Sequence, residues 1–154
     1  MQVLLASGSP RRKELLSLLG IPFLIQIPNI PETRHEGESP RRYCARISRE
    51  KALEMARQHP EALVIGADTI VVYKSRILGK PVNENEAFKT LQLLKGKWHK
   101  VITGFCVLNV DREITYHDAV ETRVFMKDLV DEEIMNYIRT SEPLDKAGSY
   151  AVQG

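Results

Sequence analysis

Apolar and polar positions along the chain follow the two periods of regular secondary structure. Short apolar runs rich in Val, Ile and Leu predict strands at residues 3–6, 23–27, 62–73, 98–110 and 113–126. Apolar side chains at helical spacing predict helices at residues 10–19, 40–59, 84–94 and 131–139. Because strands alternate with helices, we expect an α/β domain, and the two adjacent late strands predict a mixed sheet.

Two segments interrupt this pattern and are predicted to be loops. Residues 27–42 and 141–154 are rich in Pro, Gly and charged side chains, which are typical of turns and connections. No Ser/Gly linker and no internal repeat divides the chain. Its 154 residues therefore predict one domain that is large enough to bury a single core.

Composition and charge narrow the class of protein. Hydrophobic residues make up 43% of the chain and charged residues 27%, as in ordinary soluble globular proteins. Lys and Arg number 22 against 20 Asp and Glu, without one basic stripe, which argues against a stable nucleic-acid partner. The two cysteines lack metal-binding spacing, and no apolar run approaches the roughly 20 residues of a membrane span. We therefore expect a reduced, cytoplasmic protein without a membrane partner.

Residues 7–12, with the sequence SGSPRR, form the strongest local signal for a binding site. Gly8 allows a tight turn after the first strand, and Ser9 suits a helix cap. Arg11 and Arg12 then place positive charge in the first helical turn, where the helix dipole disfavours cations. Free backbone N–H groups and guanidinium groups at one helix start fit a docked anion. The alternative is an exposed helix start that tolerates the misplaced charge.

Asp68 lies inside the apolar run ALVIGADTIVVY, residues 62–73. A carboxylate in such a run is costly unless it is paired or hydrated. One interpretation is that Gly66 breaks the strand and lets Asp68 emerge into a cleft. There Asp68 would serve as a general base, as a ligand for a hard cation, or as both. The alternative is a turn residue that joins two short strands.

Two lysines are candidates for contacts with an anion. Lys51 falls in the middle of the apolar face of the helix predicted at residues 40–59. Its side chain either extends to solvent or points its ammonium group into a polar cleft. Lys80 stands between a glycine and a proline. These two neighbours restrict its backbone conformation more than a surface lysine requires. The alternative is an ordinary surface turn.

Three further polar residues complete the candidate set. Glu32 is the only acidic residue between residues 15 and 34, and a solvated loop carboxylate is its alternative interpretation. His99 and Thr103 alternate on one face of a predicted strand, where they would either line a pocket or face water. Together with the basic residues and Asp68, Glu32 suits an anionic substrate bound with a divalent cation.

Six motifs, in one order along the chain, resemble those of the Maf-like nucleotide pyrophosphatases. They are LASGSPRRKELL near the start, EKA at residues 50–52, GADTIV at 66–71, GKP at 79–81, H-x-V-x-TG at 99–104 and EPLDKAGSYAVQG at the end. The resemblance implies a two-lobed α/β fold of the ITP-pyrophosphatase-like type, with a mixed sheet and a central cleft. It also implies hydrolysis of a nucleoside triphosphate to the monophosphate and pyrophosphate, a divalent metal (Mg²⁺ or Mn²⁺) and assembly as a homodimer.

The resemblance also implies roles for individual residues. Asp68 matches the family's proposed proton acceptor, and Asp68 and Glu32 would hold the metal. The catalytic group would be Asp68, Lys51, Lys80 and Glu32. The substrate-binding group would be Ser7, Arg11, Arg12, Thr69, His99, Thr103 and Gln153.

Three positions distinguish subgroups of the family: the first residue after Ser-Pro, the residue after the catalytic Asp, and a Gln near the end. Here they are Arg11, Thr69 and Gln153, the pattern of members that prefer dTTP and UTP. Family members usually continue further at the C-terminal end. The resemblance therefore predicts a single Maf-like domain over residues 1–154 that lacks the usual C-terminal segment.

A function from a different class is the alternative: a non-catalytic regulator of cell division, or a nucleic-acid-binding module on the same fold. The sequence supports it through two basic pairs, at residues 11–12 and 41–42. Aromatic residues make up only 6% of the chain and are not interleaved with basic ones, which argues against a stacking surface for nucleic acid. Pyrophosphate release from a panel of triphosphates, with and without Mg²⁺, separates the two functions.

Overall fold

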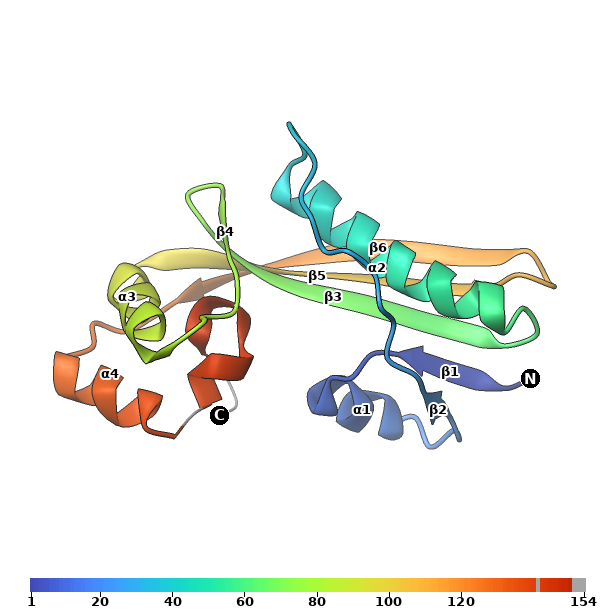
Figure 1. Cartoon of the computed structure of the whole chain (residues 1–154), viewed down its shortest axis with the longest axis horizontal. Helices are drawn as coiled ribbons and strands as arrows, with labels where there is room; N and C mark the ends of the chain where they lie inside the picture. The colour runs from blue at the N-terminus through green and yellow to red at the C-terminus, as the bar shows by residue number, and fades with distance from the viewer. Residues whose placement is uncertain (141, 151–154) are drawn as a thin grey trace. The chain divides into compact units, whose positions relative to one another are not determined.

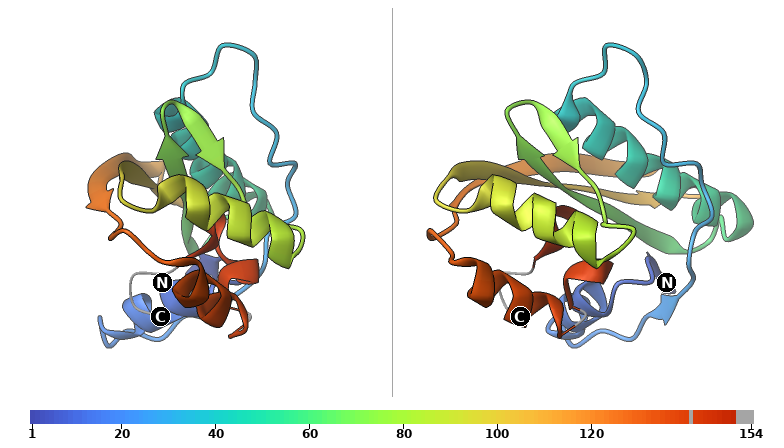
Figure 2. Two further views of the ribbon diagram at one scale, coloured as in Figure 1. Left: turned by 90° about the vertical axis from the view of Figure 1, so that its left-hand side faces the viewer. Right: turned by 60° about the vertical axis from the view of Figure 1, so that its left-hand side comes forward.

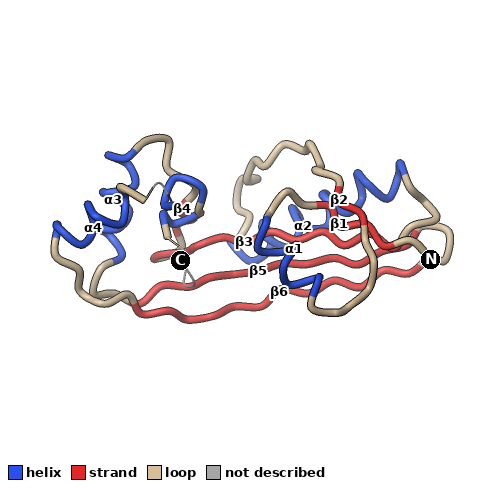
Figure 3. The backbone as a smooth tube through the Cα atoms, turned by 90° about the horizontal axis from the view of Figure 1, so that it is seen from below, coloured by secondary structure: helices blue, strands red, loops and turns tan. Residues whose placement is uncertain are grey.

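The fold is an α/β arrangement around one mixed sheet. A computed structural model describes residues 1–140 and 142–150. Its elements are β1 (Val3–Ala6), α1 (Pro10–Ser17), β2 (Leu24–Ile25), α2 (Pro40–Gln58), β3 (Leu63–Tyr73), β4 (Arg76–Leu78), α3 (Glu84–Leu94), β5 (Trp98–Asn109), β6 (Ile114–Phe125), α4 (Asp131–Ile138) and the 3-10 turns η1 (Glu142–Asp145) and η2 (Ala147–Ser149) (Figure 1). The described strands pair in the order β2-β1-β3-β5-β6, with β4 against β3 (Figure 3). β1 is parallel to β2 and β3, and β4 is antiparallel to β3, so the predicted mixed sheet is confirmed.

The elements differ from the sequence predictions in three places. β2 has only two residues, Leu24 and Ile25, and both are exposed, so little burial of apolar surface supports a longer strand. β4 was not predicted, because Lys74 and Ser75 make its turn with φ of 49° and 64° and lack the Gly or Asn that usually marks such a turn. The final segment, predicted as a loop, contains η1 and η2. None of the helices in residues 1–140 and 142–150 combines the length and the hydropathy that a membrane span requires.

Gly66 does not break its strand, so that interpretation of the sequence is wrong. β3 runs without interruption from Leu63 to Tyr73. A Cβ atom on Gly66 would lie 2.5 Å from the carbonyl oxygen of Ser48 and 2.8 Å from the backbone nitrogen of Ala52. Gly66 is therefore needed where helix α2 closely approaches the strand, and not for a turn. The alternative of a turn residue between two short strands is wrong for the same reason.

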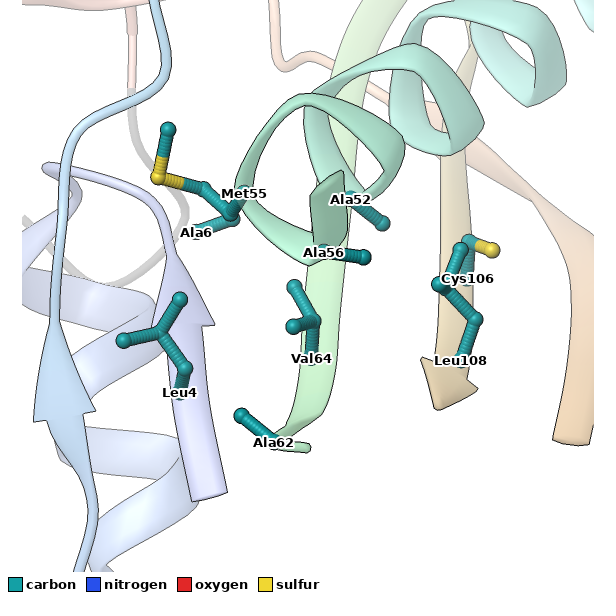
Figure 4. Packing of buried hydrophobic residues seen from close by; sticks show 9 residues of the cluster. All are labelled: Leu4, Ala6, Ala52, Met55, Ala56, Ala62, Val64, Cys106 and Leu108. Carbon is teal, nitrogen blue, oxygen red and sulfur yellow. The ribbon is translucent and has the colours of Figure 1, made fainter. Parts of the chain in front are cut away.

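The first of two compact units comprises Met1–Asp68 and Thr103–Val120. Within it, β1, α1 and β2 form a parallel β-α-β unit, and α2 lies along the sheet (Figure 1). The alanines and Met55 of α2 face small and branched side chains of the strands. This core cluster comprises Leu4, Ala6, Ala52, Met55, Ala56, Ala62, Val64, Cys106 and Leu108 (Figure 4). Small residues on both sides let the helix backbone approach the strands closely.

The second unit comprises Thr69–Ile102 and Glu121–Gly154. Its helices α3 and α4 lie side by side (Figure 2) and bury a cluster of apolar side chains. The buried members of this cluster are Ala87, Leu91, Ile134 and Ile138. The Gly148 N–H group donates to the carbonyl oxygen of Gly79 at 3.2 Å, which ties η2 to the segment after β4.

Candidate active site

Lys51 lies between two carboxylates in the first unit. Its Nζ atom is 2.7 Å from Oε1 of Glu32 and 3.2 Å from Oδ1 of Asp68. The Lys51 and Asp68 side chains are each only 13% exposed, whereas that of Glu32 is 51% exposed. Of the two sequence interpretations of Lys51, the structure thus confirms the one in which the ammonium group turns towards polar partners.

The approach of α2 to β3 produces this arrangement. Gly66 lets the helix backbone come close, and Asp68, two residues further along β3, points to the same face of the strand. The Cys44 Sγ atom, also on α2, donates to the backbone carbonyl of Asp68 at 3.3 Å. Asp68 is therefore held to α2 through its backbone by Cys44 and through its side chain by Lys51.

The electrostatics of Asp68 combine burial with nearby charge. Burial raises the pKa of Asp68, and the Lys51 ammonium group, which donates a hydrogen bond to it, opposes that rise. The Glu32 carboxylate raises the pKa further and the Arg12 guanidinium lowers it. The net result is a carboxylate more basic than one in water, which is the property required of a general base.

Cys44 is a neighbour of Asp68 that the sequence interpretation did not include in the site. Burial, reinforced by the charge of Asp68, raises the pKa of the Cys44 thiol to about 12. A thiol with that pKa remains protonated near neutral pH, so Cys44 acts as a hydrogen-bond donor and not as a nucleophile. The only sequence signal was its position on the same helical face as Lys51.

Arg12 and Ser7 extend the site to the start of α1. The Ser9 side chain accepts from the Arg12 N–H group at 3.3 Å, so the predicted cap is confirmed. The Arg12 Nη1 atom donates to Oγ of Ser7 at 3.1 Å. Burial lowers the pKa of Arg12, and the charges of Asp68 and Glu32 oppose that change, which places Arg12 in the same electrostatic cluster.

Arg11 is not part of that cluster. Its side chain is 51% exposed, and its Nη1 atom lies 3.3 Å from Oε2 of Glu14 on the same helix. The two arginines of the motif therefore differ, because only Arg12 turns towards Ser7. A role for Arg11 in substrate binding stays a prediction.

The remaining predicted residues belong to both units. Thr103 lies on β5 in the first unit, whereas Thr69, Lys80 and His99 belong to the second. Lys80 is exposed, and His99 is buried with its Nε2 atom hydrogen-bonded to the Tyr150 hydroxyl. Burial lowers the pKa of His99. Gln153 lies outside the described residues, and the roles of all five stay predictions.

Few of the described side chains near Lys51 could serve as ligands of a metal ion. No group of three or more His, Cys, Asp or Glu side chains among the described residues could hold one. Glu32 and Asp68 nevertheless each place an oxygen within 3.2 Å of the Lys51 nitrogen, so the two carboxylates lie near each other. Mg²⁺ commonly binds through one or two carboxylates together with substrate phosphates, and this pair fits that mode of binding.

The fold and this cluster together define an α/β protein with a buried carboxylate–lysine pair beside an arginine-bearing helix start. The sequence from residue 2 to residue 154 matches the Maf-like protein family, to which the chain belongs. A dTTP/UTP pyrophosphatase of Bacillus cereus (strain ATCC 10987 / NRS 248) is 48% identical over 99% of this chain and 74% of its own length. One of Bacillus anthracis (strain CDC 684 / NRRL 3495) is 47% identical over 99% of this chain and 79% of its own.

A solved structure supports the fold independently of sequence. The Ham1 protein of Staphylococcus aureus aligns with a TM-score of 0.51 over 85% of this chain and 73% of its own length. Its sequence identity is 12%, so the likeness concerns the fold. The expected membership of the Maf-like family and the α/β fold with a mixed sheet are thus confirmed.

Proposed function

We propose that this protein hydrolyses nucleoside triphosphates, dTTP and UTP preferentially, to the nucleoside monophosphate and pyrophosphate. The observation that carries the proposal is the ion-paired cluster of Asp68, Lys51 and Glu32, in a chain 48% identical to proteins named dTTP/UTP pyrophosphatase. In the reaction, water adds to the α-phosphorus and the bond from that phosphorus to the bridging oxygen breaks. The oxygen leaves with pyrophosphate, and one proton of the water must be accepted.

Asp68 is the group suited to accept that proton. Burial raises its pKa, which strengthens it as a base, while Lys51 keeps it ionised by donating a hydrogen bond at 3.2 Å. Lys51 then also stabilises the orientation of the carboxylate, since a hydrogen-bonded carboxylate cannot rotate freely. The proton returns from Asp68 to solvent after the products leave.

Arg12 is the cation suited to hold the phosphates. Ser7 fixes one Nη atom of its guanidinium group, and the start of α1 supplies backbone N–H groups next to it. A guanidinium group stabilises the charge that builds up on phosphate oxygens in the transition state. Lys80 of the second unit is proposed to add positive charge, with Thr69, His99, Thr103 and Arg11 as further substrate contacts.

A divalent cation, Mg²⁺ or Mn²⁺, is part of the proposal. Glu32 and Asp68 are the residues that would hold it, and when bound it would neutralise charge on the phosphate chain. The family's homodimer, the cytoplasmic location and the absence of a stable nucleic-acid partner stay predictions from the sequence.

The alternative of a nucleic-acid-binding module has less support in the structure than in the sequence. Of the two basic pairs behind it, one contains Arg12, which belongs to the Asp68 cluster. In the other, the Arg41 Nη2 atom donates to the carbonyl oxygen of Ala119 at 2.7 Å and serves the fold. Release of pyrophosphate from dTTP by the purified protein tests the proposal against this alternative.

Chelation is expected to abolish activity reversibly. Without a divalent ion, Arg12 and Lys51 face a triphosphate whose charge they cannot neutralise alone, because Asp68 and Glu32 cancel them. Excess chelator should therefore stop pyrophosphate release, and Mg²⁺ or Mn²⁺ added beyond the chelator should restore it. Undiminished turnover in excess chelator would contradict the metal-dependent reaction.

Base preference is expected to depend on Gln153. Its amide can accept from N3–H of uracil or thymine and donate to a neighbouring carbonyl, a two-point contact that cytosine would leave partly unpaired. Specificity constants for dTTP and UTP should exceed those for CTP and 7-methyl-GTP, and Gln153→Ala should reduce the difference. A preference for 7-methyl-GTP would contradict the subgroup, and selectivity unchanged by the substitution would contradict the role of Gln153.

A further inference from the structure

Glu32 sits in a long segment without regular structure, yet its carboxylate meets Lys51 at 2.7 Å. The segment, residues 26–39, joins β2 to α2. The Glu32 side chain is 51% exposed, so burial does not fix its position. Some other contact must hold this part of the loop against the helix.

Two side chains of α2 donate hydrogen bonds to the loop backbone at consecutive residues. The Tyr43 hydroxyl donates to the carbonyl oxygen of Glu32 at 3.1 Å. The Arg46 Nη2 atom donates to the carbonyl oxygen of Thr33 at 2.7 Å. Tyr43 and Arg46 are three residues apart on one helical face, and the Arg46 guanidinium lies 5.6 Å from the centre of the Tyr43 ring.

Arg46 is itself anchored by acidic partners. Its Nε and Nη2 atoms contact the two carboxylate oxygens of Glu38 at 2.7 and 2.9 Å, and its Nη1 atom contacts Glu50 at 3.1 Å. Such two-point pairs are among the strongest hydrogen bonds between charged groups. Hydrogen bonds from Arg46 hold the pKa of Glu38 at about 2, so this pair stays ionised down to well below neutral pH.

We propose that Tyr43 and Arg46 are positioning residues that hold the Glu32–Thr33 backbone so that the Glu32 carboxylate stands beside Lys51 and Asp68, ready for a divalent cation. The proposal rests on the proposed function only for the role of Glu32 in metal binding. In this proposal, Tyr43 and Arg46 bind neither the cation nor the substrate. Their effect reaches the reaction through Glu32 alone.

The test compares Tyr43→Phe, which removes only the hydroxyl group, with Arg46→Met, which removes the guanidinium group. Mn²⁺ binding is measured by the electron paramagnetic resonance signal of the free ion, in the presence of a non-hydrolysable dTTP analogue. Loss of an outer partner of a metal-binding residue typically weakens metal affinity 10–100-fold. We expect Arg46→Met to raise the dissociation constant about tenfold, and Tyr43→Phe about fivefold, as for the loss of one hydrogen bond.

A double-mutant cycle with Glu32→Gln separates positioning from general stability. In the Glu32→Gln background, the Tyr43 and Arg46 substitutions should have less than about a twofold further effect on Mn²⁺ binding, because their target is gone. Arg49→Met, which removes an exposed arginine of the same helix, is the matched control and should bind Mn²⁺ like the wild type. In Tyr43→Phe and Arg46→Met, the turnover number at saturating Mg²⁺ should change less than the Mg²⁺ concentration that gives half-maximal activity.

The outcomes distinguish the two proposals. If Glu32→Gln weakens Mn²⁺ binding but Tyr43→Phe and Arg46→Met do not, the positioning role is overturned and the proposed function stands. If the latter two weaken binding equally in both backgrounds, they act through stability and the positioning role is again overturned. Absence of pyrophosphate release by the wild type overturns the proposed function, whereas the Mn²⁺ measurements still decide the positioning role. If Glu32→Gln leaves Mn²⁺ binding unchanged, both the role of Glu32 and its positioning are overturned.

Discussion

Asp68→Asn is expected to lower the rate of pyrophosphate release at least about 100-fold, within the range that a general base contributes. The amide oxygen can still accept the hydrogen bond from Lys51, and the backbone contact from Cys44 is unchanged, so the fold should persist. An amide cannot take the proton of the attacking water. Turnover measured at saturating nucleotide and metal gives the loss, and calorimetric titration of the nucleotide analogue should show binding within a few-fold of wild type.

Asp118→Asn is the matched control for this substitution. Asp118 belongs to the same unit, and its Oδ1 atom accepts from the Ala119 N–H group at 2.7 Å. The Asp118→Asn substitution should leave the rate of pyrophosphate release unchanged. If Asp68→Asn kept more than about a tenth of the wild-type rate, a loss below about 1.4 kcal/mol, Asp68 would not be the base.

The pH dependence of the wild type follows from the same group. Burial raises the pKa of Asp68, and a base must be ionised to act. The rate should therefore fall on acidification at a pH above the ordinary pKa of an aspartate, and be restored as pH rises. An acid limb at or below the ordinary aspartate pKa would contradict this environment.

Gly66→Ala is expected to destabilise the protein by about 1–3 kcal/mol, the usual cost of overpacking, and to impair activity as well. The added Cβ atom would lie 2.5 Å from the Ser48 carbonyl oxygen and 2.9 Å from the Ala52 Cβ atom. The first of these is backbone, so α2 must move away from β3. Because Lys51 is on the helix and Asp68 on the strand, their 3.2 Å contact should lengthen.

Thermal unfolding measures the effect, with Gly79→Ala as the control. A Cβ atom on Gly79 would meet no atom within 4 Å, so its substitution should leave the melting temperature nearly unchanged. For a chain of this size, 1 kcal/mol corresponds to about 2–4 °C. Equal melting temperatures for the two variants would show that α2 does not pack on Gly66 as described.

Sequence periodicity predicted most of the regular elements because burial imposes it. Helix α2 was expected over residues 40–59 and is found at Pro40–Gln58, since its apolar face meets the sheet along its full length. The same periodicity singled out Lys51 as a charge among apolar positions. What it could not provide was the distance between α2 and β3, which depends on small residues from both elements. Gly66 was consequently interpreted as a break in the strand.

The sequence predicted only the part of the candidate site that leaves a local pattern. Asp68 and Lys51 stand out locally, because each places charge in an apolar pattern. The position of Glu32 depends on Tyr43 and Arg46, which contact the loop from a different element and leave no local pattern in the sequence. Such contacts between distant segments require a structure.

The thiol of Cys44 gives the molecule an internal chemical reporter. With a pKa of about 12, only about one thiol in 10⁵ is ionised at pH 7, so alkylating reagents barely react with it in the folded state. Cys106 is the other cysteine, and it is also buried. When α2 lifts off β3, the Cys44 thiol enters water and regains an ordinary acidity. The rate of Cys44 alkylation therefore measures how often α2, which carries Lys51, separates from β3, which carries Asp68.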